Sequence, residues 1–321
     1  MRSVQRAVTA HFTTSLFVLL WSSGAIFAEL GVRHASALAF LIARFALASL
    51  ALAAVACWRG RWLPPRGGRR ITAVIGLLMG VYSIGYLLAL ERGITPGMLA
   101  TLLGAQPILT LALVERRWSA PRGAGLLLAL LGLALVVWRG LAGGGVSATG
   151  AGFALAALVA ITAGALLQKR SGVAPADGLA LQTAIGVAMS ALCLPLSSAP
   201  FAFDGSWPLI AAVLWLGLVI SVAGQMLFYR LMRDGDAVNV TSLFYLVPVV
   251  TTLMDALGFG HLPGLPELAG MAAILAGLAL VFRHAPDRAM RQKKARRHTS
   301  ESEASCRARG PVAEDVSPDS Q

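Results

Sequence analysis

Ten apolar stretches, each close to the length of a membrane-crossing helix, divide this sequence. A helix needs about 20 mostly apolar residues to cross the roughly 30 Å hydrocarbon core of a bilayer. Clusters of Arg, Pro and Gly separate most of the stretches. We therefore predict an all-α integral membrane protein with ten transmembrane helices, at about 12–30, 36–57, 71–90, 96–114, 122–138, 150–168, 178–197, 208–229, 238–257 and 267–283.

The composition agrees with a membrane-embedded chain. Hydrophobic residues make up 57% of the 321 residues, and only 13% are charged. A typical soluble domain has about 25% charged residues. The mean hydropathy of +0.72 points the same way.

The basic residues indicate an orientation in the membrane. The formal net charge is +12. All Lys and Arg except Arg33, Arg44, Arg92 and Arg139 lie at the N-terminus, in alternate loops or in the C-terminal tail. Cytoplasmic loops carry such an excess. We therefore predict both termini in the cytoplasm, and the basic charge does not indicate nucleic-acid binding.

The first apolar stretch has a second interpretation. Arg2 and Arg6 precede it and "GAIFAEL" ends it, so it could be a secretory signal cleaved after Ala28. The alternation of loop charges holds only if this stretch is kept. We therefore interpret 12–30 as the first transmembrane helix.

No pattern for catalysis or metal binding is found. Cys57, Cys193 and Cys306 have no paired spacing. HExxH, GxSxG, CxxC and phosphate-binding loop patterns are absent from the sequence. The sequence predicts neither an enzyme nor a nucleotide-driven pump, and no cofactor or metal.

Two similar words indicate an internal repeat. "GLALVV" occupies 132–137 and "GLALVF" occupies 277–282. Upstream of each lie a charged turn with glycine, a helix start with threonine, and a mid-helix proline, Pro107 or Pro248. We predict two five-helix repeats, 12–139 and 150–283, followed by a basic, disordered tail at 284–321.

Five helices per repeat imply that the second copy is inverted. An odd number of crossings makes it enter the membrane from the opposite side. The loop charges invert accordingly, since "ERRWSAPRG" has three arginines and its counterpart "GFGHLPGLPE" has none. Inverted repeats allow a site near the midplane to open alternately to either side. The sequence thus predicts a secondary transporter with a small-molecule substrate.

Several stretches resemble a known family. They are "YRLMRDGDAVNVTSLFYLVPVVTTLMD", "LAGMAAILAGLALVF", "ALERGITPGMLATLLGAQPILT" and the "ARF" around Arg44. Over about 12–283 the chain is similar to EamA-type proteins of the drug/metabolite transporter superfamily. In that pattern a glutamate follows the fourth helix. Here Glu115 comes early after Pro107, and His261 takes the second position.

The resemblance carries implications for architecture and function. It implies that helices 1–4 and 6–9 enclose a central cavity and that helices 5 and 10 pack at the periphery. It also implies efflux of an amino acid, metabolite or drug across the bacterial inner membrane, with proton coupling. A non-transporting membrane scaffold or lipid-handling protein is the alternative function.

Three ionisable residues within the predicted spans are candidates for the site: Glu29, Arg44 and Asp255. Such residues are costly in a bilayer and are functional hypotheses by default. They could form a structural ion pair, an extracellular gate, or, through Arg44, a site for a substrate carboxylate. Asp255 or Glu29 could also carry a coupling proton if burial raised its pKa.

Polar and aromatic residues at mid-depth complete the candidate site. Such groups either bind a solute in an apolar cavity or bridge helices. Pro107 and Pro248 free backbone carbonyls, which fits a helix bend or a cavity lining. The other candidates are Trp21, Ser22, Ser23, Tyr82, Tyr86, Gln106, Gln225, Tyr245 and Thr251.

The tail after Arg283 is polar and rich in Lys and Arg. Basic residues beside a membrane attract anionic lipid headgroups. They also fix topology, and the sequence leaves both roles open.

Overall fold

The computed structural model describes residues 2–60, 63–94, 96–115, 119–137, 147–197, 201–259 and 263–284. Inter-residue contacts divide the chain after Arg283. The predicted disordered tail therefore lies, apart from His284, outside the described residues. Within the described ranges the regular structure is helical, with one isolated β-bridge between Ala35 and Phe203.

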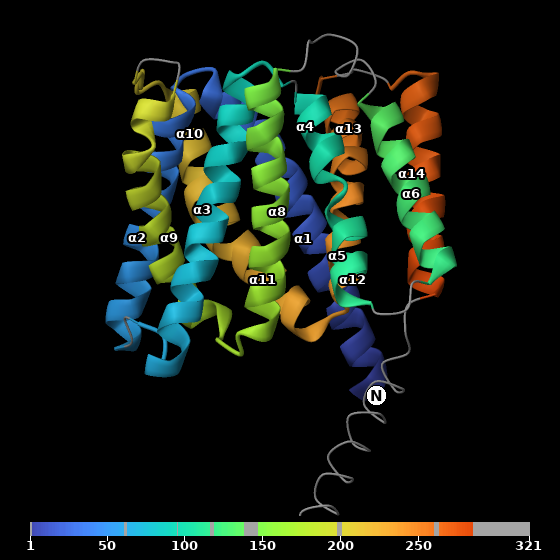
Figure 1. Cartoon of the computed structure of the whole chain (residues 1–321), viewed down its shortest axis with the longest axis horizontal. Helices are drawn as coiled ribbons and strands as arrows, with labels where there is room; N and C mark the ends of the chain where they lie inside the picture. The colour runs from blue at the N-terminus through green and yellow to red at the C-terminus, as the bar shows by residue number, and fades with distance from the viewer. Residues whose placement is uncertain are drawn as a thin grey trace, which may run out of the picture. The chain divides into compact units, whose positions relative to one another are not determined.

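The helices of residues 2–283 stand side by side as a bundle (Figure 1). In the first repeat they are α1 (Arg2–Val32), α2 (Ala37–Arg59), η1 (Arg66–Gly68), α3 (Arg69–Glu91), α4 (Pro96–Leu103), α5 (Gln106–Val114) and α6 (Ala120–Val136). In the second they are α8 (Ala148–Arg170), α9 (Pro175–Leu192), η2 (Leu194–Leu196), α10 (Trp207–Leu214), the π-helix η3 (Trp215–Gly224), α11 (Gln225–Asp234), α12 (Ala237–Ser242), η4 (Leu243–Tyr245), α13 (Leu246–Phe259) and α14 (Leu265–Arg283).

Each of the ten predicted stretches falls on a helix or on an interrupted run of helices. Seven runs are long and apolar enough to cross a membrane: Phe12–Val32, Ala37–Arg59, Arg66–Glu91, Ala148–Arg170, Trp207–Asp234, Ala237–Met254 and Leu265–Arg283. Two apolar helices, Met98–Val114 and Ala120–Val136, are shorter. The protein is therefore a multi-pass helical membrane protein, and the total of ten crossings stays a prediction.

Both predicted mid-helix prolines lie at helix breaks. Pro107 is in the first turn of α5, directly after the break from α4, and Pro248 follows the 3₁₀ turn η4. Proline has no backbone N–H and cannot bond the carbonyl four residues earlier. The carbonyls of Leu103 and Phe244 thus lose their usual helical partner.

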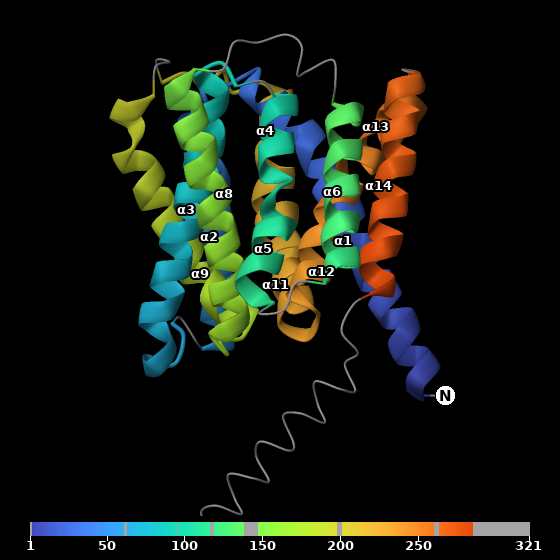
Figure 2. The same ribbon diagram turned by 45° about the vertical axis from the view of Figure 1, so that its right-hand side comes forward.

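The last helices of the two repeats, α6 and α14, pack side by side and antiparallel (Figure 2). A Cβ added to Gly125 would lie 2.7 Å from the carbonyl oxygen of Gly277. One added to Gly132 would lie 2.6 Å from that of Gly270. Since Gly125 matches Gly270 and Gly132 matches Gly277 in the repeat, the two contacts are related by a local two-fold axis.

The other contacts between repeats follow the same symmetry. The third helix of the first repeat, α3, packs on α8 and α9. The third helix run of the second repeat, α10–η3–α11, packs on α1 and, through α10 and η3, on α2. Likewise α4 and α5 contact α8, and α13 contacts α1. Equivalent helices therefore make equivalent contacts.

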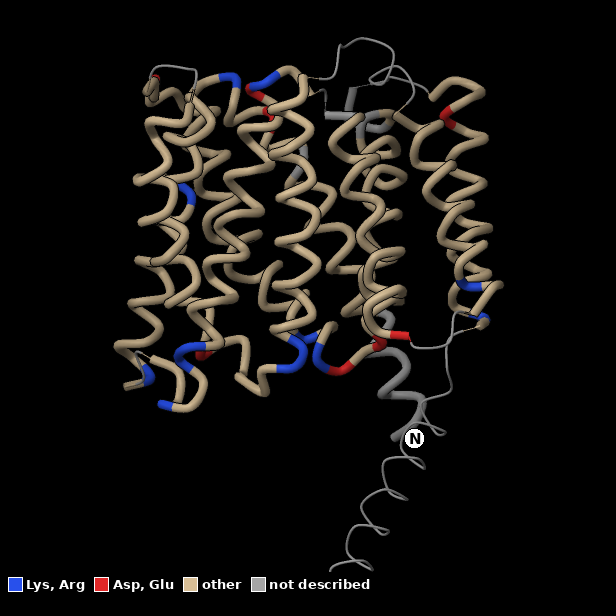
Figure 3. The backbone as a smooth tube through the Cα atoms, in the orientation of Figure 1, with Lys and Arg blue, Asp and Glu red and all other residues tan. Residues whose placement is uncertain are grey.

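Charged residues gather at the two ends of the bundle, and its middle is nearly free of them (Figure 3). Large apolar side chains such as Leu50, Leu131 and Leu192 are exposed on the outside. This outer surface suits contact with lipid tails, which offer no hydrogen bonds.

At the upper end in Figure 1, the turn before α2 is joined to the segment before α10. The Ser36 N–H donates to the Ala202 carbonyl at 2.9 Å, and His34 Nδ1 lies 2.7 Å from Asp204 Oδ2. A backbone N–H of Ser206 holds the pKa of the Asp204 carboxyl below its usual range, helped by its side chain and by His34. Asp204 therefore stays charged at neutral pH.

Candidate functional site

A cavity of about 520 Å³ lies between the two repeats. Its lining includes Trp21, Gly24 and Ala28 from α1, which runs upward, and residues between Phe40 and Phe45 from α2, which runs downward. At α1 and α2 the cavity thus reaches from mid-height toward the upper end, whereas Leu179 and Gln182, near the start of α9, line it closer to the lower end.

Most of the polar and aromatic residues predicted from the sequence meet at this cavity. Ser22 and Ser23 do not line it. The Ser22 hydroxyl donates to the Val18 carbonyl at 2.7 Å, and Ser23 Oγ accepts from Trp215 Nε1 at 3.0 Å. The lining includes the predicted Trp21, Arg44, Tyr82, Tyr86, Gln106, Pro107, Gln225, Tyr245, Pro248 and Thr251.

The structure separates the predicted ionisable residues. Glu29 does not line the cavity and accepts a hydrogen bond from Arg33 at 2.6 Å. Both side chains are about two-thirds exposed, at 67% and 69%. Glu29 is therefore not the partner of Arg44. Asp255 lies on α13, and its side chain is outside the described part of the protein.

Arg44 lies on α2 and lines the cavity. Its Nε donates to Ser221 Oγ at 2.8 Å. Ser221 belongs to the π-helix η3, a helix form often found at functional sites. A Cβ at Gly217 would come 3.1 Å from the Arg44 carbonyl, so glycine there allows η3 to approach α2 closely. Arg44 is the only charged residue among the described lining residues.

Six polar lining residues were not predicted from the sequence. Two of them belong to a hydrogen-bonded chain, in which the Tyr229 hydroxyl donates to Gln182 Oε1 at 2.9 Å and Gln182 Nε2 donates to Gln168 Oε1, behind the lining, at 3.1 Å. The signal that identified Gln106 and Gln225, an amide inside an apolar stretch, is also present at Gln168 and Gln182. The missed lining residues are Ser83, Gln182, Thr183, Ser221, Tyr229 and Thr252.

The first repeated word also contributes to the lining, through Leu133, Val136 and Val137 at the end of α6. The family resemblance implied that the fifth and tenth helices, α6 and α14, lie at the periphery of the bundle. That is wrong for the end of α6, whereas no described residue of α14 lines the cavity.

The two helix breaks meet at the cavity. The Tyr245 hydroxyl donates to the Gly104 carbonyl at 2.6 Å. Gly104 and Tyr245 each precede their proline by three residues, so equivalent positions of the two repeats bond to each other. Glycine at position 104 also lets Leu133 of α6 pack closely here, since a Cβ at Gly104 would lie 2.5 Å from Leu133 Cδ2.

We expect Tyr245→Phe to lower the free energy of unfolding by about 1–3 kcal/mol, because the variant leaves the Gly104 carbonyl buried without its partner. Denaturant unfolding of the purified protein in detergent measures the change. Tyr82→Phe is the matched control, because no described group bonds the Tyr82 hydroxyl. Equal stability of the two variants would contradict the role of this bond.

An aromatic cluster closes the cavity from below. The Phe17 and Phe228 rings stack with centroids 5.7 Å apart, and Trp21 meets Phe244 edge-on at 5.3 Å. Trp21 and Phe244 line the cavity, whereas Phe17 and Phe228 belong to the buried core. We call these four residues the aromatic floor.

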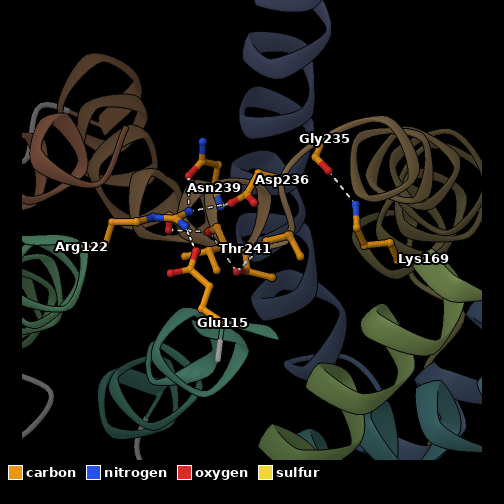
Figure 4. Close-up of polar contacts among 10 residues, drawn as sticks. Glu115, Arg122, Lys169, Gly235, Asp236, Asn239 and Thr241 are labelled. Carbon is orange, nitrogen blue, oxygen red and sulfur yellow. Dashed lines mark hydrogen bonds and ion pairs between the residues drawn. The ribbon is translucent and has the colours of Figure 1, made fainter. Parts of the chain in front are cut away.

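An ionic cluster that was not predicted from the sequence lies at the lower end of the bundle, and its contacts are drawn in Figure 4. Arg122, at the start of α6, has no exposed side-chain surface. It donates to Glu115 Oε1, to Asp236 Oδ1 at 2.6 Å and to Asn239 Oδ1 at 2.8 Å. We call these four residues the Arg122 cluster. Arg122 and Asp236 had been interpreted only as loop charges, because they lie 114 residues apart in the sequence.

The Arg122 cluster joins the repeats at the lower end of the bundle. Glu115 and Arg122 belong to the first repeat, and Asp236 and Asn239 to the second. Asp236 also caps α12 by accepting from the Asn239 backbone N–H at 3.1 Å. Nearby, Lys169 Nζ of α8 donates to the Gly235 carbonyl at 2.6 Å. Helix α8 therefore also binds the turn between α11 and α12.

Comparison with known proteins identifies the family. The model of the EamA-like transporter family matches residues 8–138 and again 148–283. The chain belongs to the EamA-like transporter family. Its two matches confirm the repeat and the family resemblance found in the sequence.

Relatives of this EamA-like protein are named as transporters. An "Uncharacterized transporter" of Archaeoglobus fulgidus is 24% identical over 84% of this chain and 96% of its own length. The "Uncharacterized transporter YvbV" of Bacillus subtilis is 28% identical over 49% of this chain and 52% of its own length. A crystal structure with 20% identity covers 85% of this chain and 97% of its own, with a TM-score of 0.69, and shows the same fold.

The family and the names of these relatives indicate that this EamA-like protein is a membrane transporter. Within the described ranges no three His, Cys, Asp or Glu residues are grouped as a metal site would require.

Proposed function

We propose that this protein exports a small organic solute across the bacterial inner membrane by alternating access, with both termini in the cytoplasm. The observation that supports this most is the cavity of about 520 Å³ between the repeats. Ligand pockets range from about 300 to 1,000 Å³ and are mostly apolar with a few placed polar groups. A non-transporting scaffold has no need of such a cavity.

Ten crossings arranged as two inverted repeats allow the conformational change that alternating access requires. The glycine contacts between α6 and α14 and the paired helix contacts support repeats 12–139 and 150–283 related by an axis in the membrane plane. With such symmetry, the two repeats can exchange conformations so that the cavity closes above and opens below.

In the described conformation the aromatic floor and the Arg122 cluster close the cavity toward the lower end of the bundle. We call these two groups of residues the lower gate. Opening it requires α12 to separate from α5 and α6, which breaks the bonds of Arg122 to Asp236 and Asn239. The breaks at Pro107 and Pro248 supply the bends. We keep Glu29 and Asp255 as candidates for the upper gate and for a coupling proton.

Filling the cavity should stop export. A Cβ at Gly24 would meet Ile220 Cγ1 at 3.4 Å and Leu216 Cδ2 at 3.7 Å, which are ordinary contacts with other lining residues. We expect Gly24→Phe to fold and to occupy the solute volume. Gly152→Phe is the matched control, because a Cβ at Gly152 meets nothing within 4 Å.

The experiment compares metabolites in cells and in medium, with and without overexpression, against an empty vector. We expect a defined class of small solutes to accumulate in the medium with the wild type and Gly152→Phe, but not with Gly24→Phe. Equal accumulation with Gly24→Phe would contradict the cavity as the path. No change with the wild type would contradict export.

A further inference from the structure

We propose that Arg44 binds the carboxylate of the transported solute, which makes the substrate a small organic anion with an apolar or aromatic body. This inference rests on the proposed function and names the class of solute that its cavity accepts. Four properties of the cavity support it: the charge of Arg44, the geometry of its guanidinium group, a second donor with no described partner and the apolar lining.

The charge of Arg44 has no described counter-charge. No described carboxylate lies within 4.0 Å of its guanidinium group, and Glu29 is engaged by Arg33. An uncompensated charge inside a membrane protein is costly and faces a bundle interior or a water-filled cavity. An anion entering the cavity would balance the charge of Arg44.

The geometry of the guanidinium group suits a carboxylate. The bond from Nε to Ser221 Oγ fixes the plane of the group and leaves the two terminal nitrogens without a described partner. These nitrogens belong to a residue that lines the cavity. Two parallel N–H donors match the two oxygens of a carboxylate, which is a strong and directional arrangement.

A second donor is left over at the same cavity. Gln106 is 3% exposed and lines the cavity, and its Nε2 has no hydrogen-bond partner among the described residues. Buried amide donors are nearly always bonded. An unpartnered donor on the lining indicates a ligand that brings an acceptor.

The rest of the lining fits an apolar body. Aromatic rings of Trp21, Phe40, Phe45 and Phe244 face the cavity together with aliphatic side chains. No acidic side chain is found among the described lining residues, so no described counter-charge faces a cationic solute. The solute is therefore anionic and apolar, rather than cationic.

A matched series of solutes tests the sign of the charge without any mutation. Purified wild-type protein in detergent is heated with phenyl-substituted and alkyl monocarboxylates of graded length, with their primary amides and with the corresponding amines. Inorganic phosphate is included as an anion with no organic body. We expect carboxylates to raise the melting temperature and their amides, amines and phosphate to leave it unchanged.

Transport by the same series gives the second measurement. In proteoliposomes we expect labelled carboxylates to be carried at least tenfold faster than their amides. Arg44→Gln should remove this preference, and Arg44→Lys should keep part of it because it retains the charge. Arg170→Gln, which removes an exposed arginine from the last turn of α8, should leave transport unchanged.

The outcomes separate this inference from the proposed function. Amides or amines carried as well as carboxylates, a carboxylate preference that survives in Arg44→Gln, or stabilisation by phosphate alone would overturn the inference and leave transport standing. If wild-type liposomes carry no solute of the series and none from a whole-cell metabolite extract, the proposed function is overturned as well.

Discussion

Replacing Arg122 by glutamine is expected to lower the free energy of unfolding by about 3–5 kcal/mol, the usual cost of breaking a buried ion pair. Arg122 is fully buried and bonded to Glu115, Asp236 and Asn239. Glutamine brings no positive charge. The variant therefore leaves two carboxylates, 10% and 14% exposed, without the charge between them.

Arg170→Gln is the control for the Arg122 substitution, because Arg170 is an exposed arginine in the last turn of α8 near the same end. Denaturant unfolding of the purified proteins in detergent compares the two variants with the wild type. We expect a change below about 0.5 kcal/mol for the control, as for most surface substitutions. Similar stabilities for both variants would contradict the role assigned to the Arg122 cluster.

The second large effect is expected at the contact between α6 and α14. A Cβ at Gly277 would lie 2.5 Å from the Gly125 carbonyl oxygen and 2.7 Å from the Ala129 backbone nitrogen. Both atoms belong to backbone and cannot rotate away. We expect Gly277→Leu to cost about 3 kcal/mol, the upper end of the usual range for overpacking.

Gly123→Leu is the control for the Gly277 substitution, because it also places leucine on this helix pair but at a position where a Cβ meets nothing within 4 Å. Glycine costs a helix about 1 kcal/mol relative to good helix formers. The control should therefore be as stable as the wild type or more so. A Gly277→Leu protein with wild-type stability would contradict the close α6–α14 packing.

The sequence predicted the helices and the repeat because both depend on local patterns. Apolar length located the helices, and the two prolines located the breaks. The words at 132–137 and 277–282 identified the pair that packs through glycine. The peripheral position implied for both helices is wrong for the end of α6, since Val136 lines the cavity and its counterpart on α14 does not.

Many residues of the candidate site were predicted from the sequence, but the contacts between charged residues were not. Arg44, Gln106 and Tyr245 were identified as polar or aromatic groups within apolar stretches, and this rule needs no partner. The Arg122 cluster could not be found in this way, because Arg122 and Asp236 are 114 residues apart and each resembles an ordinary loop charge. For the same reason Glu29 was considered as a partner of Arg44. In the structure Glu29 pairs instead with Arg33, four residues along the helix.

The central claim is that solute crosses the membrane through the cavity between the repeats. Its most direct test is efflux from proteoliposomes that contain purified protein and are loaded with a whole-cell metabolite extract, followed by mass spectrometry of the outer solution. The account predicts release of a defined class of small solutes from liposomes with the wild type or Gly152→Phe, and none from liposomes with Gly24→Phe or without protein. Identical release from all four preparations would contradict it.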